Sequence, residues 1–171
     1  MRESPPSAPK PSSKLAAACG GVFVGYRGYE HDKITPRFPF GYGLSYTRFI
    51  YSGLNIQPVN NSEKKGLYEV TFTVKNTGKV EGAEVAEIYV GEASPKLPRP
   101  EKELKGFSKV NLRPVESKRV SILLNSRAFA YYDMAAQKWT INPGIFNIMV
   151  GHSSQQIDLR GTLKIDSPIV Y

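Results

Sequence analysis

The amino-acid sequence predicts an all-β fold, a two-sheet antiparallel sandwich of about seven strands. Short runs of residues alternate between apolar and polar side chains, which is the pattern of a half-buried antiparallel strand. Turn residues separate these runs, and the 15 glycines and 13 prolines among 171 residues favour a turn-rich fold. No amphipathic helical pattern of useful length competes with this interpretation.

The first predicted strand carries Phe49, Tyr51, Leu54 and Ile56. The second, residues 68–74, alternates cleanly and ends at an Asn-Thr-Gly turn. Residues 85–90, 119–124 and 157–165 show the same alternation, and residues 138–141 and 145–150 are two further predicted strands. An Asn-Pro-Gly turn separates two of them at residues 142–144, and residues 126–132 allow a single helical turn.

This spacing of short strands is typical of a sandwich of immunoglobulin or fibronectin type III character. The chain has one cysteine, Cys19, so no disulfide can bridge the two sheets as in an antibody domain. We expect Trp139 and many of the tyrosines and phenylalanines to supply core volume. Residues 1–20 are rich in proline and serine, have no apolar run long enough for a secretory signal, and are expected to be a disordered tail.

Charge and composition exclude several classes of function. The formal charge is +8, but acidic residues interrupt the basic ones between Lys96 and Arg119, which favours a solvated surface over a nucleic-acid site. No apolar run is long enough to span a membrane. With His31 and His152 far apart in loops and one cysteine, we expect no metal site and no cofactor.

Two segments interrupt the strand pattern. Residues 92–103 contain three prolines, which keep this loop extended and out of a sheet. Residues 37–46 read RFPFGYGLSY and are too aromatic for a solvated loop, so their side chains are expected to pack against another surface. We expect Tyr26, Arg27 and Tyr29, which precede this segment, to be poorly fixed.

Several motifs resemble a known family. They are VGYRGYE at 24–30, FPFGYGLSYT at 38–47, PRPEKELKGFSKVNL at 98–112, SRAFAYYD at 126–133, Trp139 and NPGIFNIMVGHSS at 142–154. Together they resemble the C-terminal, fibronectin type III-like domain of glycoside hydrolase family 3 β-glucosidases. The resemblance implies that residues 21–45 are a connection from a missing α/β sandwich domain and that residues 46–168 are the β-sandwich.

The resemblance also implies what this chain lacks. Retaining glycosidases use two carboxyl groups, one as nucleophile and one as acid/base. In this family the nucleophile lies in a Ser-Asp-Trp-like motif of a barrel domain, and the acid/base lies in the α/β sandwich. The motif does not occur in this sequence, and residues 126–133 around Asp133 match the fibronectin-like domain instead. We therefore expect no catalytic residue and no activity from this chain alone.

The resemblance implies a module that braces the catalytic domains of a β-glucosidase. The expected interdomain contact residues come from the aromatic segment, residues 37–46, and from the proline loop, residues 92–103. They are Phe38, Phe40, Tyr42, Tyr46, Pro98, Arg99, Pro100 and Lys102. The alternative is a binding module that adsorbs to carbohydrate or lignin through exposed aromatic and basic residues. Asn60 begins a glycosylation sequon, the parent family implies an extracellular location, and we expect a monomer.

Overall fold

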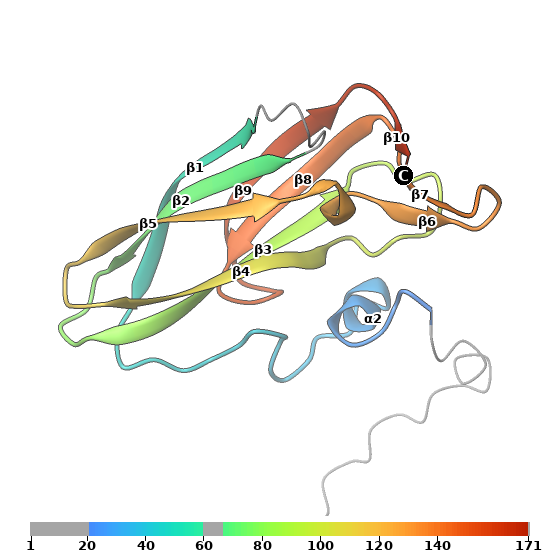
Figure 1. Ribbon diagram of the computed structural model, residues 1–171. Coiled ribbons are helices and arrows are strands. Elements are labelled where there is room, and N and C mark those ends of the chain that lie inside the picture. The colour runs from blue at the N-terminus through green and yellow to red at the C-terminus, as the bar shows by residue number, and fades with distance from the viewer. Residues whose placement is uncertain (1–20, 60–66, 171) are drawn as a thin grey trace, which may run out of the picture.

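The computed structural model describes residues 21–59 and 67–170. The predicted disordered tail and Asn60 lie outside the described residues. Two antiparallel sheets face each other (Figure 1). The first sheet has the order β1-β2-β5 and consists of β1 (Phe49–Pro58), β2 (Tyr68–Asn76) and β5 (Ser117–Leu124). The second has the order β4-β3-β8-β9 and consists of β4 (Glu103–Leu112), β3 (Gly82–Glu92), β8 (Gly144–Gly151) and β9 (Ile157–Ile165). The predicted fold class is confirmed.

A small third sheet lies at one end of the sandwich. It has the order β10-β7-β6 and consists of β10 (Ile169–Val170), β7 (Lys138–Ile141) and β6 (Tyr131–Asp133). The 3₁₀ turn η1 (Ser126–Ala128) precedes it, where the sequence allows a helical turn. The predicted strand 138–141 is therefore β7, outside the two main sheets, and β4 takes its place in the sandwich.

The apolar–polar alternation does not reveal the full length of β4, because Gly106 and Ser108 occupy inward positions opposite Ile88 and Ala86, and only Val110 and Leu112 at its end lie in the core. A side chain at Gly106 would meet Ile122 of the opposite sheet, so this glycine faces inward. Phe107, the neighbouring large apolar residue, is exposed. Only the resemblance of residues 98–112 to the family indicates a strand here.

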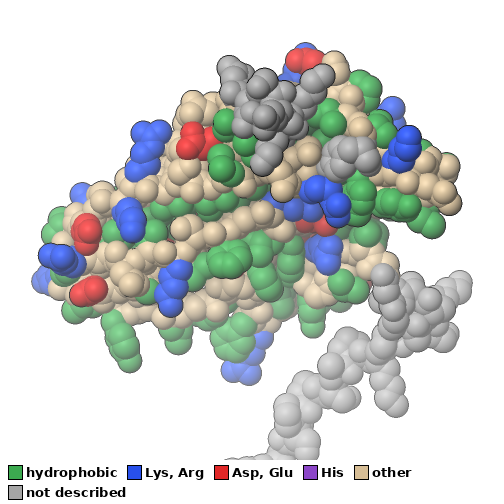
Figure 2. Space-filling model, in the orientation of Figure 1, with side chains coloured by type: hydrophobic (Ala, Val, Ile, Leu, Met, Phe, Trp, Pro, Cys, Tyr) green, Lys and Arg blue, Asp and Glu red, His purple; other side chains and the backbone are tan. Residues whose placement is uncertain are grey.

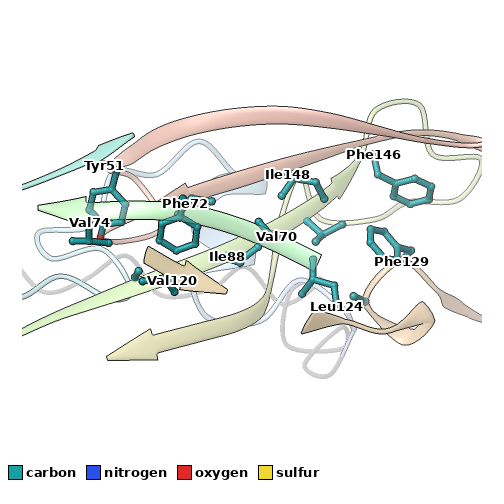
Figure 3. Close-up of a cluster of buried hydrophobic side chains, with 14 of the residues drawn as sticks. Tyr51, Val70, Phe72, Val74, Ile88, Val120, Leu124, Phe129, Phe146 and Ile148 are labelled. Carbon is teal, nitrogen blue, oxygen red and sulfur yellow. The ribbon is translucent and has the colours of Figure 1, made fainter. Parts of the chain in front are cut away.

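The core fills the space between the two main sheets (Figure 3). Phe72 and Tyr51 stack at one end with ring centroids 5.9 Å apart. Phe129 and Phe146 meet edge to face at 5.4 Å at the other. Trp139 is partly buried and packs against this core rather than standing inside it. Burying aromatic side chains of this size supplies much of the hydrophobic stabilisation of a small sandwich.

Within residues 21–45, the helix and the backbone at Gly41 pack against the outer face of the second sheet. This helix, α2 (Tyr26–His31), lies beside β3 and β4 (Figure 1). The Tyr26 ring meets the edge of Tyr89 at 5.8 Å, and its hydroxyl accepts a hydrogen bond from the Leu104 backbone at 2.7 Å. Tyr89 is consequently fully buried, although it lies on the predicted polar face of its strand. The expectation that Tyr26 and Arg27 are poorly fixed is wrong.

Candidate docking surface

Exposed apolar side chains gather on the segment between α2 and β1. The aromatic strip, as we name it, comprises Phe38, Phe40, Tyr42, Leu44 and Tyr46. Phe38 is 63% exposed, and Leu44 and Tyr46 project almost entirely into solvent at 90% and 102%. Figure 2 shows hydrophobic side chains projecting from the lower edge of the molecule, along which this segment runs in Figure 1. Contiguous apolar exposure of this kind marks a contact surface.

The backbone of the strip is held on the sandwich at both ends. The Ser154 amide donates to the Phe40 carbonyl at 2.8 Å. Gly41 has a φ of 82° and lies against the buried carboxylate of Glu87, leaving no room for a side chain. After the strip, the Thr47 hydroxyl donates to Asn76 Oδ1 at 2.5 Å. The strip is therefore an anchored segment with exposed large side chains, of which Phe40 also stacks on Tyr26 at 4.9 Å.

Glu87 sits beneath the strip and is almost fully buried. The Tyr89 hydroxyl donates to Glu87 Oε2 at 2.6 Å. Burial raises the pKa of Glu87, against the opposing effect of this hydrogen bond, and the nearby charge of Glu84 raises it further. The carboxylate is thus a supporting group beneath the backbone of the strip.

The proline loop contributes less exposed surface than the strip. Pro98 is exposed, but Pro100 is buried. Arg99 donates to Glu92 at 2.9 Å and to the Phe129 carbonyl at 3.2 Å. Of the four loop residues expected to contact a neighbouring domain, Pro98 alone is exposed.

A network of ion pairs fastens α2 to the start of β4. Glu103 lies at its centre, 3.1 Å from Arg27, 3.3 Å from Lys105 and 3.5 Å from Arg99. Lys102 Nζ lies 2.7 Å from the mostly buried carboxylate of Glu30. Partly buried pairs of this kind are screened less than surface pairs, so the network fixes how α2 lies on the sheet.

A second polar cluster joins the two sheets near the other end of the strip. His152 Nδ1 lies 2.5 Å from Glu84 Oε1 and His152 Nε2 lies 3.3 Å from Asp158 Oδ2. The Tyr51 hydroxyl donates to Glu84 Oε1 at 2.8 Å from the first sheet. Glu84 and His152 also line a cavity of about 470 Å³ beside residues 41–45.

Burial by itself lowers the pKa of His152, but the hydrogen bonds and charges of Glu84 and Asp158 outweigh it and raise that pKa above its usual value. Sequence reasoning missed this cluster because its members come from three separate strands, β1, β3 and β9, and from the loop after β8. It pairs groups of opposite charge, and among the described residues no group of three His, Cys, Asp or Glu side chains is placed to hold a metal ion. Within the same residues, no helix is long and apolar enough to cross a membrane.

Comparison with known proteins agrees with the fold. Residues 84–154 match the family described as "Fibronectin type III-like domain". The fold and this match define the class: the chain carries a fibronectin type III-like β-sandwich domain. Its relatives are glycoside hydrolase family 3 β-glucosidases, as the sequence resemblance implies.

Thermostable β-glucosidase B of Acetivibrio thermocellus is 44% identical over 149 residues, which cover 87% of this chain and 20% of the enzyme. The structure of β-glucosidase 3B from Thermotoga neapolitana, in complex with α-D-glucose, has a TM-score of 0.79 and 34% identity, covering 88% of this chain and 20% of its own. The GH3 β-glucosidase of Bifidobacterium adolescentis has a TM-score of 0.79 and 38% identity, covering 85% of this chain and 21% of its own. The chain spans about one fifth of the length of these relatives.

Proposed function

We propose that this chain is a non-catalytic module that braces the catalytic domains of a family 3 β-glucosidase through the aromatic strip. One observation carries the proposal: five large apolar side chains are exposed on a backbone that the sandwich holds at both ends. Burying a side chain of this size stabilises a contact by about 1.5–3 kcal/mol. Because the backbone is already ordered, little entropy is lost when a neighbouring domain covers it.

The same proposal assigns residues 21–45 to the connection that enters the module and residues 46–168 to the sandwich. The ion pairs of Arg27 and Lys102 support it, because they fix the direction in which the chain arrives at the sandwich. A neighbouring domain attached before α2 would thereby be held in one orientation. A location outside the cell, which the parent family implies, and a monomeric state remain predictions.

Adsorption to carbohydrate or lignin is the weaker alternative. A platform for sugar rings would place exposed aromatic side chains in a flat row on one sheet face. Here they lie on an irregular segment instead, and the rings of Phe38 and Tyr42 are tilted by 39° to each other. This arrangement favours an interdomain contact.

A chimeric enzyme tests the proposal. This chain would replace the matching one fifth of the Acetivibrio thermocellus β-glucosidase, which is 44% identical to it. Serine substitutions at Phe38, Tyr42, Leu44 and Tyr46 should lower the temperature of half-inactivation by at least about 5 °C, because the interface loses several kcal/mol of apolar burial.

The matched control carries serine at Val80, Val115 and Val170, which are also exposed but lie outside the strip. This control should behave like the parent chimera, and both sets of substitutions should leave the unfolding of the isolated chain nearly unchanged. Equal half-inactivation temperatures for the strip variant and the parent chimera would refute the proposal.

A further inference from the structure

A groove at the end of the sandwich that carries β6 and β7 is independent of the aromatic strip. It has a volume of about 450 Å³, and none of the strip residues lines it. One wall is the proline loop, with Leu97, Pro98 and Pro100, and the other is the β6–β7 hairpin, with Tyr132 and Trp139. Concave, mostly apolar sites of this size are typical of small-molecule binding.

Internal contacts hold the two walls of the groove at a fixed spacing. Arg99 comes from the proline loop, donates to the carbonyls of Phe129 and Ala130 just before β6, and lies 5.8 Å from the centre of the Tyr131 ring. On the hairpin, Tyr132 and Trp139 meet edge to face at 5.5 Å. The groove therefore needs little reorganisation before it accepts a ligand.

Among the residues that the structure describes, one cation in the groove has no anionic partner. Arg99 pairs with Glu92, and Lys105 pairs with Glu103. Arg127 stacks on Trp139, with its guanidinium carbon 3.6 Å from the ring centre, and forms no ion pair within the described part of the chain. A stacked guanidinium keeps its in-plane N–H groups available for a carboxylate.

The stacking also decides which class of ligand fits. Arg127 covers one face of Trp139, and the indole packs against the core. This arrangement disfavours stacking of a neutral sugar ring on the tryptophan. We propose that the groove is a binding site for aryl carboxylates, with the aromatic ring between the proline loop and Tyr132 and the carboxylate on Arg127. This proposal does not rest on the bracing function.

The test titrates the full chain with 3-phenylpropanoate and follows amide and indole resonances by NMR. Trp139 is the single tryptophan, so its indole N–H signal reports on the groove without ambiguity. Saturable shifts of Trp139 and Ala130 are expected, with a dissociation constant between about 0.1 and 5 mM, as for a small ligand held by one charged contact. The uncharged amide of the same acid should bind at least about tenfold more weakly.

Three variants separate the proposed contact from a general effect of charge. R127Q should weaken binding at least about tenfold, while R127K, which keeps the charge but not the planar fork, should lose about fivefold or less. R113Q removes an arginine that is likewise exposed, on the turn between β4 and β5, and should bind like the parent chain. Unchanged resonances of the β1–β2 sheet would show that each variant is folded.

Four results would overturn the inference. One is the absence of shifts at Trp139 and Ala130 in the parent chain. The second is equal binding of the acid and its amide, or of the parent and R127Q. The third is a groove that responds to cellobiose but not to the acid, which would assign it to carbohydrate. If the acid binds the isolated chain but not the chimeric enzyme, the groove belongs to an interdomain interface and the proposal also fails.

Discussion

At the scale of single residues, the aromatic strip depends on close packing between a backbone and a buried acid. Gly41 lies directly on Glu87, with a positive φ that residues with a side chain adopt only at a cost. The Ser154 amide also donates a hydrogen bond to the carbonyl of Phe40, the residue before Gly41, and so fixes the backbone at this position. The strip can therefore keep its large side chains exposed without losing its own order.

Gly41→Ala should lower the free energy of unfolding by about 2 kcal/mol, because it adds backbone strain and displaces Glu87. Gly43→Ala is the matched control, since a methyl group there meets no atom within 4 Å. It should change the free energy by less than about 0.5 kcal/mol. Urea unfolding of both variants checks this, and equal effects would show that the Gly41 contact carries no stability.

We predict that stability depends on pH through His152, because this side chain lies in the loop after β8 between two carboxylates from β3 and β9. Its folded-state pKa is raised above 6.5, so the folded chain binds the proton more tightly than the unfolded chain. The resulting stabilisation is complete below pH 6.5 and is lost as the pH rises through the folded-state value. The groups that face it are Glu84 on β3, Asp158 on β9 and Tyr51 on β1.

Urea unfolding should therefore give a lower free energy at about pH 8.5 than at about pH 6. His152→Gln should remove most of this difference. His31→Gln is the control, because it also removes one histidine but forms no ion pair among the described residues. Burial, ahead of the opposing effect of His152, raises the pKa of Asp158, so the contribution of Asp158 to stability is complete below pH 3.8 and is lost as the pH rises through its folded-state value. A pH difference that persists in His152→Gln would contradict the role of the cluster.

At the scale of elements, the sequence could predict the strands whose inward face is continuously apolar. It could not predict that the outer face of β3 is buried, because Tyr89 and Glu87 alternate with core residues and the pattern therefore assigns them to the solvent-facing side. They are buried because α2 and the strip, distant in sequence, fold back over them.

The break in the apolar–polar pattern of β1 has a local cause. Gly53, with a φ of 66°, forms a bulge between Ser52 and Asn55 that shifts which residues face inward.

Tyr26 is the side chain through which α2 contacts the second sheet most closely. Tyr26→Ala removes its packing on Tyr89 and Phe40 and leaves the Leu104 amide without its acceptor, so it should cost about 2–3 kcal/mol. Tyr26→Phe keeps the ring and should cost only about 1 kcal/mol.

Tyr29→Ala, in the same helix but 47% exposed, is the control and should be nearly neutral. Hydrogen exchange at Leu104 should accelerate in both Tyr26 variants and stay unchanged in the control. If Tyr26→Ala and Tyr29→Ala are equally stable, α2 does not form part of the folded unit.

At the scale of the whole molecule, the apolar periodicity and the turn residues were enough to predict a β-sandwich. The sequence motifs were enough to predict which proteins are its relatives. The candidate site was only partly predictable. The aromatic strip stands out in the sequence because glycines separate its rings. The Arg99 contacts, the Glu103 network and the His152 cluster depend on chain segments far apart in sequence. Four of the eight predicted contact residues lie in the proline loop, and of these four only Pro98 is exposed.

We expect a catalytic domain to cover the strip in the assembled enzyme. Hydrogen exchange measured on the isolated chain and on the chimeric β-glucosidase tests it most directly. In the chimera, the backbone amides of residues 41–46 should exchange at least about tenfold more slowly than in the isolated chain. The exposed turn at residues 113–116 should exchange equally in both. Equal exchange of residues 41–46 in the two proteins would contradict the claim.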